Sequence, residues 1–405
     1  MSGKGKAISA VMIITLVSKC LGFLRDMILA YYYGAGSVTD AYCIAQTIPE
    51  FLFSLVIQAI AVGFIPTFIG IVEGEGKNKA WSFTDNLGLV GVMLVTVVVF
   101  VVYAFTDAIV YLFASGFDDE TAALASLLTR VSIWGLFFRI IAAIDSALLN
   151  ANEKFTISAL TGFPLDVITI ASIALASYTN QPVLLAVGIL LSYASQMVLQ
   201  RPFVRRVKPK IDLRSFNLRD PHLLKMLALF LPVAIGVGAN QINILVDKTL
   251  VSSFVGGVSS LNYANKVDNV FENVMILSLA TVMFPSFSKY AARGDNEALT
   301  SSIVKSCLVT MIVMVPCSIA AFVCAEDIIR LLFGRGVFDD QAISMTTHAM
   351  QCYAVGLAFL SVNAILTRAI YGFKKVMPVS LCSCCSLVVN VGLSFAFVVP
   401  WGVPG

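Results

Sequence analysis

The sequence is poor in charged side chains. Only 13% of its 405 residues are Asp, Glu, Lys or Arg, and it contains two histidines and three tryptophans. A soluble globular domain carries about 25% charged residues, so this composition argues against a soluble fold. Hydrophobic residues make up 58% of the chain, and the mean hydropathy is +0.89. We therefore predict an integral membrane protein, and the net charge of +3 gives no indication of nucleic-acid binding.

The motifs of the common catalytic sites are also missing. The chain has no phosphate-binding P-loop, no glycine-rich dinucleotide fingerprint and no Ser, His and Asp residues at a spacing that indicates a catalytic triad. His222 and His348 lack a partner motif, which favours structural or surface roles. The clustered cysteines lack further ligands at zinc spacing and are interpreted as helix-packing residues: Cys382, Cys384 and Cys385. We expect no enzymatic activity, and energy must come from an ion gradient or the membrane potential.

Apolar stretches of membrane-spanning length recur along the whole chain. Crossing about 30 Å of hydrocarbon takes about 20 helical residues. We predict eleven transmembrane helices, near residues 7–33, 41–70, 84–112, 122–149, 157–178, 182–204, 224–254, 261–288, 300–325, 342–371 and 377–400. The first span is too long, and too charged at its centre, for a cleavable signal peptide.

Basic residues predict the orientation, because Lys and Arg in short loops stay on the cytoplasmic side. With a cytoplasmic N-terminus, the inner loops hold Lys77, Lys79, Lys154 and the basic segment 201–225. The outer loops then hold only Arg330 and Arg335. This asymmetry agrees with the number of spans.

Four landmarks recur in the same order at an offset near 220 residues. Asp26-x-x-Leu29 returns as Asp247-x-x-Leu250, and the landmarks at 66–68, 112–120 and 154 return at 285–287, 332–340 and 374. Six spans per period predict two parallel repeats around a central cavity. The N-terminal lobe would be 1–215 (spans 1–6) and the C-terminal lobe 216–405 (spans 7–11). The second copy lacks its sixth helix, so we expect a fragment or a truncated form.

The first span carries Lys19, Arg25 and Asp26. A charge at the centre of a span costs roughly 2.5–3.5 kcal/mol on insertion scales, so such residues normally face a bundle interior or a wet cavity. Gly22 shares a helical stripe with Lys19 and Asp26, and it would let a neighbour approach or bend the helix. The pattern predicts a polar cavity, and an interhelical salt-bridge lock is the alternative.

The opening of the chain is similar to a known family. The runs are Ser18-Lys19-x-Leu21-Gly22-Phe23-x-Arg25-Asp26, Gly34-Ala35-Gly36-x-x-Thr39-Asp40-Ala41-Tyr42, Tyr263-Ala264-Asn265-Lys266, Phe284-Pro285-Ser286-Phe287-Ser288-Lys289 and Tyr353-Ala354-Val355-Gly356-Leu357. They resemble the MurJ-type lipid II flippases of the multidrug/oligosaccharidyl-lipid/polysaccharide exporter superfamily. The resemblance implies transport of undecaprenyl-diphosphate-linked peptidoglycan precursor from the inner to the outer leaflet, in a monomer of the bacterial cytoplasmic membrane.

The resemblance also implies a site. Headgroup-binding basic residues would be Lys19, Arg25 and Lys266, with Asp26 and Asp40 as acidic partners in the cavity. A departure follows Pro49, where the usual two basic residues are replaced by an apolar and polar stretch with Glu50 nearby. Lys266 replaces an arginine of the family and loses bidentate geometry. These differences leave a related polyprenyl-linked saccharide open as the substrate.

A sodium site is implied at Asp247, together with Asn390 and Ser394 at i, i+4 of the eleventh span. A structural carboxylate, paired with Lys248, is the alternative. The other charges within spans, Arg139, Asp145 and Asp166, are interpreted as pairing with one another, against cavity lining.

Two further functions stay open. A cation-coupled drug exporter of the same superfamily would have an acidic and aromatic cavity without a cationic cluster. A non-transporting membrane scaffold would use its charges only to hold helices together.

Overall fold

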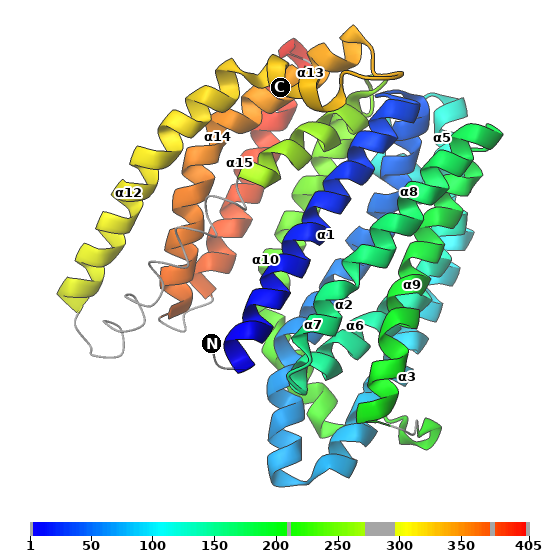
Figure 1. Cartoon of the computed structure of the whole chain (residues 1–405), viewed down its shortest axis with the longest axis vertical. Helices are drawn as coiled ribbons and strands as arrows, with labels where there is room; N and C mark the ends of the chain where they lie inside the picture. Colours follow the sequence, from blue (N-terminus) through cyan, green and yellow to red (C-terminus); the bar gives the residue numbers. More distant parts are fainter. Residues whose placement is uncertain (1–2, 209–211, 272–295, 373–376, 402–405) are drawn as a thin grey trace.

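The computed structural model describes residues 3–208, 212–271, 296–372 and 377–401 (Figure 1). Within these residues every regular element is a helix, as predicted. The described residues 3–208, here the first half, contain α1 (Gly3–Tyr33), α2 (Ser37–Gly74), α3 (Lys77–Ala104), α4 (Thr106–Phe113), α5 (Asp119–Ser132), α6 (Leu136–Ala151), α7 (Phe155–Leu160), α8 (Gly162–Thr179) and α9 (Val183–Val207). The described residues 212–401, the second half, contain α10 (Pro221–Val251), α12 (Asn296–Val323), α13 (Ala325–Phe333), α14 (Asp340–Gly372) and α15 (Met377–Trp401), with residues 257–271 also helical.

The described helices have the length and composition of a multi-pass membrane protein. Eight helices or helix pairs are long and apolar enough to cross a bilayer, and α10, bent by 57° between Leu231 and Val233, brings the number to nine. The 31 residues of α1 would measure about 46 Å, which is also enough. The predicted span 261–288 begins in the helical residues 257–271 and continues outside the described residues.

Local chemistry sets several helix ends. Gly34 follows α1 with φ of +62° and donates its N–H to Ala30 O at 2.9 Å, a C-terminal cap that suits glycine. Asp118 precedes α5, and its carboxylate accepts a hydrogen bond from the Thr121 N–H at 3.4 Å. Asp220 caps α10 in the same way through the N–H of His222 at 2.8 Å. These caps place the turns at the two ends of the bundle.

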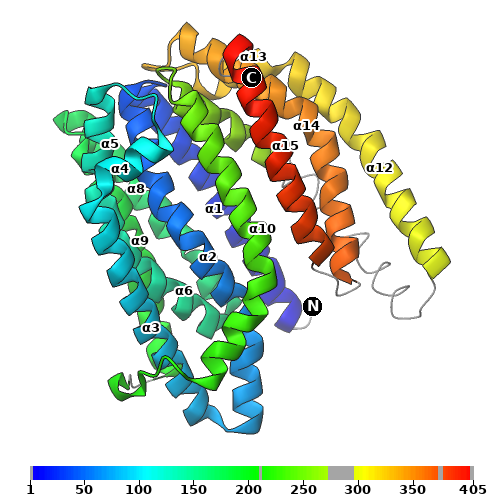
Figure 2. The ribbon, with the colours of Figure 1, turned by 180° about the vertical axis from the view of Figure 1, so that it is seen from behind.

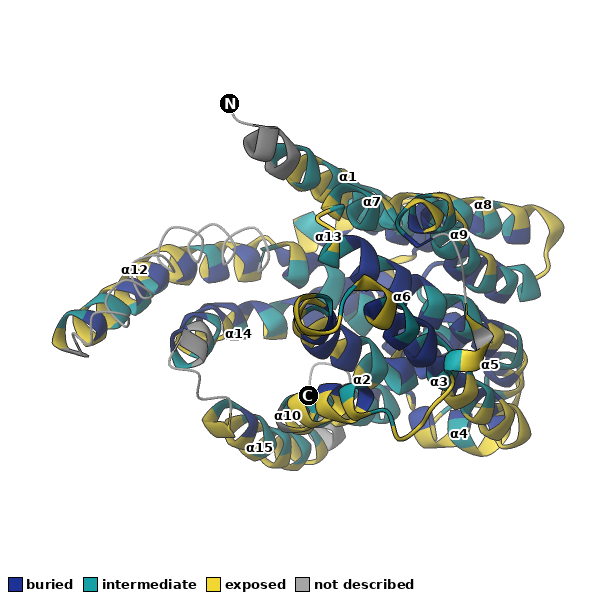
Figure 3. Ribbon diagram, turned by 90° about the horizontal axis from the view of Figure 1, so that it is seen from below, coloured by how far each residue is buried: buried dark blue, intermediate teal, exposed yellow. Residues whose placement is uncertain are grey.

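The first half forms a close-packed bundle around α2. Its buried core includes Ile44, Phe64 and Leu136, and buried residues gather among α2, α3 and α6 in Figure 3. By contrast, α12 and α15 carry mostly exposed or partly exposed residues, as expected for helices that face lipid or a wet space. A second buried cluster, which includes Tyr263, Phe333 and Phe338, packs against Phe23 and Met27 of α1.

The two halves meet at the upper end of Figure 1 and separate toward the lower end. Figure 2 shows α10 lying between α2 and α15, so α10 stays beside the first half along its length. At Gly63 of α2, an added Cβ would lie 2.4 Å from the Met226 side chain of α10. Helices α12, α14 and α15 diverge from the first half toward the lower end (Figure 2). The connections α2–α3, α6–α7 and α9–α10 lie at this lower end (Figure 1).

Candidate functional site

The charges in α1 form a buried cluster with α8. Arg25 Nη2 lies 2.9 Å from Asp26 Oδ1, and Arg25 Nη1 lies 2.9 Å from Asp166 Oδ1. The three side chains are only 12%, 7% and 7% exposed. Gly22 allows the approach predicted from its position, because an added Cβ would lie 3.4 Å from an Asp166 oxygen. One guanidinium is therefore shared by two carboxylates.

The prediction that Arg139, Asp145 and Asp166 pair with one another is wrong. Asp166 binds Arg25 from α1, and Asp145 lies 3.2 Å from Arg201 Nε of α9. Arg139 instead donates a hydrogen bond to the Tyr193 hydroxyl at 3.2 Å. The reason is helix packing: α6 packs against α9 and α8 packs against α1, so each of the three residues meets a partner from another helix.

Within the part of the chain that the structure describes, the two lysines of the predicted headgroup site have no such partners. Lys19 is exposed on α1, and Lys266 is half-buried in the helical residues 257–271. Among the described residues neither lysine forms an ion pair. No hydrogen bond or ion pair that involves only described residues joins Lys19, Arg25 and Lys266 to one another.

Asp40 joins the two halves. The residue is 1% exposed, and its carboxylate accepts hydrogen bonds from the backbone N–H groups of Gly256 and Ser259, both at 2.7 Å. These N–H groups belong to the first turn of the helical residues 257–271 and its preceding glycine, where an acidic side chain caps unsatisfied donors. Next to it, the Tyr263 hydroxyl donates to Gly34 O at 3.3 Å.

The repeated landmarks meet crosswise around Asp40. Val337 N donates to Tyr31 O at 3.1 Å, and Gly116 N donates to Ser252 Oγ at 2.9 Å. Tyr31 and Ser252 are 221 positions apart, and Val337 directly follows Gly336, the counterpart of Gly116, so the two contacts join corresponding turns with the halves exchanged. We call the region formed by residues 31–40, 112–117, 249–263 and 335–338 the upper junction. The landmarks at 285–287 and 374 lie outside the described residues.

The predicted sodium ligands lie on neighbouring helices. Gly236 of α10 faces Ser380 and Ser383 of α15, and both helices run in the same direction (Figure 2). Eleven residues further along, Asp247 is therefore level with Asn390 and Ser394. The Oδ1 atom of Asn390 is buried without a hydrogen-bond partner among the described residues. Lys248 turns away from Asp247 and donates to Thr47 Oγ1 of α2, so the alternative Asp247–Lys248 pair is not formed.

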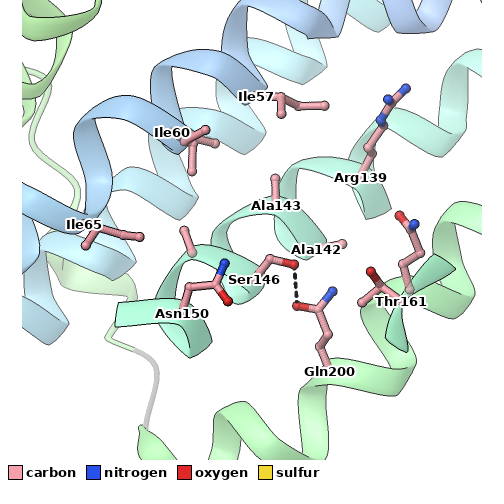
Figure 4. A pocket seen from close by; sticks show the side chains of 13 residues that line it. Ile57, Ile60, Ile65, Arg139, Ala142, Ala143, Ser146, Asn150, Thr161 and Gln200 are labelled. Carbon is pink, nitrogen blue, oxygen red and sulfur yellow. Dashed lines mark hydrogen bonds between the residues drawn. The ribbon is translucent and has the colours of Figure 1, made fainter. Parts of the chain in front are cut away.

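Sequence reasoning missed a cavity of about 380 Å³ inside the first half (Figure 4). Its lining includes Arg139, Asn150, Gln196 and Gln200, from α6 and α9. Gln196 and Gln200, one turn apart in an apolar span, were a signal that could have indicated it.

Comparison with known proteins agrees with this architecture. The family described as "Lipid II flippase MurJ" matches residues 29–405. A relative named "Probable lipid II flippase MurJ" from Buchnera aphidicola subsp. Baizongia pistaciae is 28% identical over 381 residues, covering 92% of this chain and 73% of the relative. The "Lipid II flippase MurJ" of Burkholderia cenocepacia is 26% identical over 371 residues, covering 89% of this chain and 72% of that protein.

Solved structures show the same fold. A lipid II flippase MurJ in an inward closed conformation superimposes with a TM-score of 0.82 at 24% identity, covering 97% of this chain and 82% of that one. An inward-facing multidrug resistance MATE family transporter of the MOP superfamily gives 0.80 at 17% identity, covering 97% and 92%. An outward-facing MATE family transporter gives 0.65 at 17% identity, covering 98% and 89%. With a family match over nearly its whole length and this fold, the chain belongs to the lipid II flippase MurJ family.

Proposed function

We propose that this protein moves lipid II, the undecaprenyl-diphosphate-linked peptidoglycan precursor, from the inner to the outer leaflet of the bacterial cytoplasmic membrane. The observation that carries the proposal is the family match over residues 29–405. The protein is a transporter and not an enzyme. It works by alternating access, as a monomer driven by an ion gradient or the membrane potential.

The task suits the charges of the fold. A diphosphate headgroup is anionic and cannot cross hydrocarbon without help, whereas the polyprenyl tail can stay in lipid. Lys19 and Lys266, which have no ion pair among the described residues, supply positive charge for the diphosphate. Arg25 can bind it only in competition with Asp26 and Asp166, both within 2.9 Å. Arg25 therefore releases a carboxylate when the headgroup binds.

The contacts between the halves support two lobes, 1–215 and 216–405, that rock about a pseudo-two-fold axis. Reciprocal contacts hold the upper junction closed, while α12, α14 and α15 diverge at the lower end (Figure 2). Basic residues of the lower connections, such as Lys77 and Lys154, favour a cytoplasmic lower end and N-terminus. The TM-scores against the inward closed flippase (0.82) and the inward-facing MATE transporter (0.80) are higher than the 0.65 against the outward-facing MATE transporter, which supports an inward-facing arrangement.

Sodium is the coupling ion in this proposal. The residues that would hold it are Asp247, Asn390 and Ser394, a carboxylate, an amide and a hydroxyl that suit a small hard cation. The fit rests on the buried Asn390 oxygen, which lacks a hydrogen-bond partner within the described chain. Bound sodium would link α10 to α15.

Reconstitution into vesicles tests the proposal. Labelled lipid II and a second undecaprenyl-diphosphate-linked sugar are supplied, and the fraction of each reaching the far leaflet is measured. We expect transport of lipid II, with loss of most of the rate in Lys19→Gln and little change in Lys79→Gln, an exposed lysine of α3. If only the other lipid-linked sugar is transported, that sugar and not lipid II is the substrate. If neither is transported, the proposal that the protein is a flippase is contradicted.

A further inference from the structure

The cavity in the first half has one cationic end and one amide-lined end. Figure 4 shows Arg139 of α6 at one end, with Asn150 and Gln200 toward the other. The wall from α2 is apolar and includes Ile57, Ile60 and Ile65 (Figure 4). Its volume of about 380 Å³ lies at the low end of the roughly 300–1,000 Å³ of small-molecule sites. It can take part of a large headgroup but not the whole.

Arg139 supplies the cation of this site. Its guanidinium carbon lies 4.9 Å from the centre of the Tyr193 ring and 5.7 Å from that of Phe53, and one N–H reaches the Tyr193 hydroxyl. Within the described chain no carboxylate lies within ion-pair distance of it, whereas Arg25 and Arg201 each contact an aspartate. A guanidinium has five N–H donors, so most remain for a ligand. The two rings hold the group in place before a ligand arrives.

The amide end offers further donors, from the buried Gln200 and the half-buried Asn150 and Gln196. Gln200 is 1% exposed, and its Oε1 accepts from Ser146 Oγ at 3.0 Å, which leaves its NH₂ group to point into the cavity (Figure 4). Asn150 Oδ1 accepts from Ser158 Oγ at 2.5 Å, and this likewise directs the Asn150 NH₂ group away from that contact. Gln196 lines the same space, and no hydrogen bond of its side chain is formed with other described residues. Amide donors that are wholly or partly shielded from water in this way favour carbonyl or hydroxyl acceptors.

We propose that this cavity binds a short peptide end bearing a free carboxylate, namely the peptide portion of the lipid-linked headgroup. Arg139 forms a charge-assisted pair with the carboxylate, the amides bind peptide carbonyls, and the α2 wall receives small apolar side chains. One cation among neutral amides suits a singly charged carboxylate, whereas a diphosphate calls for more than one cation. The inference rests on the proposed function, because it assigns part of that substrate to a second site away from Lys19 and Lys266.

A binding titration tests the cavity without any transport step. The purified protein in lipid nanodiscs is titrated calorimetrically with a soluble pentapeptide that ends in a carboxylate, and with the same peptide ending in an amide. We expect the acid to bind about tenfold or more tightly than the amide, a difference abolished in Arg139→Gln. Arg139→Lys keeps the charge without the planar fork and should give an intermediate preference. Arg130→Gln, which removes a partly exposed arginine outside the cavity, should retain the wild-type preference.

The outcomes separate this inference from the proposed function. Equal affinity for the two peptides, an unchanged preference in Arg139→Gln, or no binding to the wild-type protein would overturn the cavity assignment while lipid II transport still stood. Absence of lipid II transport combined with Arg139-dependent peptide binding would overturn the flippase and keep the peptide site. Unfolding temperatures of all variants are measured in parallel, and Arg139→Lys decides the matter if Arg139→Gln is unstable.

Discussion

At the scale of single residues, arginines in membrane-spanning helices take different roles according to what faces them. Arg25 is enclosed by two carboxylates, whereas Arg139 is held between two aromatic rings. The first arrangement fixes α1 against α8, and removing the cation would leave two buried anions. The second leaves a cation available to a ligand.

Arg25→Gln should lower the free energy of unfolding by about 3–5 kcal/mol, because it leaves Asp26 and Asp166 buried and uncompensated. Adding Asp166→Asn should recover part of that loss. Denaturant unfolding in detergent measures both variants. Arg130→Gln is the control: its partner Asp107 is 74% exposed, so we expect about 0–1 kcal/mol. Equal losses of unfolding free energy in Arg25→Gln and Arg130→Gln would contradict the role of Arg25 as the buried counter-charge of Asp26 and Asp166.

Asp40→Ala should loosen the upper junction, since two backbone N–H groups at Gly256 and Ser259 lose a charged acceptor worth about 1.5–3 kcal/mol each. A cysteine at the fully buried Ser260, in a protein whose native cysteines are replaced, reports the change by its rate of maleimide labelling. We expect faster labelling in Asp40→Ala. Thr39→Val is the control, because the Thr39 hydroxyl donates only to backbone oxygens of its own segment, and its labelling rate should not rise. Equal labelling rates in Asp40→Ala and Thr39→Val would argue against Asp40 as a cap that joins the two halves.

At the scale of elements, the turns of the upper junction are packed backbone against backbone. At Gly116 an added Cβ would lie 2.4 Å from Ser253 N, and at Gly336, with φ of +68°, it would lie 2.2 Å from Tyr31 O. Real Cβ atoms cannot approach so closely, so both glycines are needed for contact between the halves.

Gly116→Ala and Gly336→Ala should each separate the turns that they join, at a cost of about 1–3 kcal/mol in the free energy of unfolding. Labelling at Ser260→Cys should rise in both. Gly70→Ala in α2 meets no atom within 4 Å and should leave the stability unchanged or slightly higher. Unaltered labelling in the two junction variants would show that the turns accommodate the added methyl group without separating.

At the scale of the whole molecule, alternating access requires the upper junction to open. Tyr31 and Val337 share a backbone hydrogen bond across it, and the two residues are 49% and 63% exposed. A reducible crosslinker between Tyr31→Cys and Val337→Cys should therefore lower the transport rate by more than tenfold, and reduction of the crosslink should restore it. Single-cysteine proteins treated alike serve as controls. Full transport by the crosslinked protein would exclude opening at this junction.

Sequence reasoning reached the fold through hydropathy and repetition. The membrane class, the helical architecture and most spans follow from apolar segments that must satisfy their backbone hydrogen bonds internally. The repeat at about 220 residues also indicated which turns correspond, and the backbone N–H groups of Gly116 and Val337 each donate across to the corresponding turn of the other half. The headgroup roles of Lys19, Arg25 and Lys266, and the cavity role of Asp40, stay predictions.

The partners of charged residues could not be read from the chain. Arg139, Asp145 and Asp166 are close in sequence, yet each contacts a side chain from another helix, because helix packing decides which faces meet. The same holds for Asp40, whose partners lie more than 200 residues away. The sequence by itself determined a helical membrane protein with a repeated pattern, since hydrophobic burial and backbone hydrogen bonding act locally. Only the tertiary structure decided which charges are neutralised and which, like Arg139, face a cavity, since that depends on contacts between distant segments.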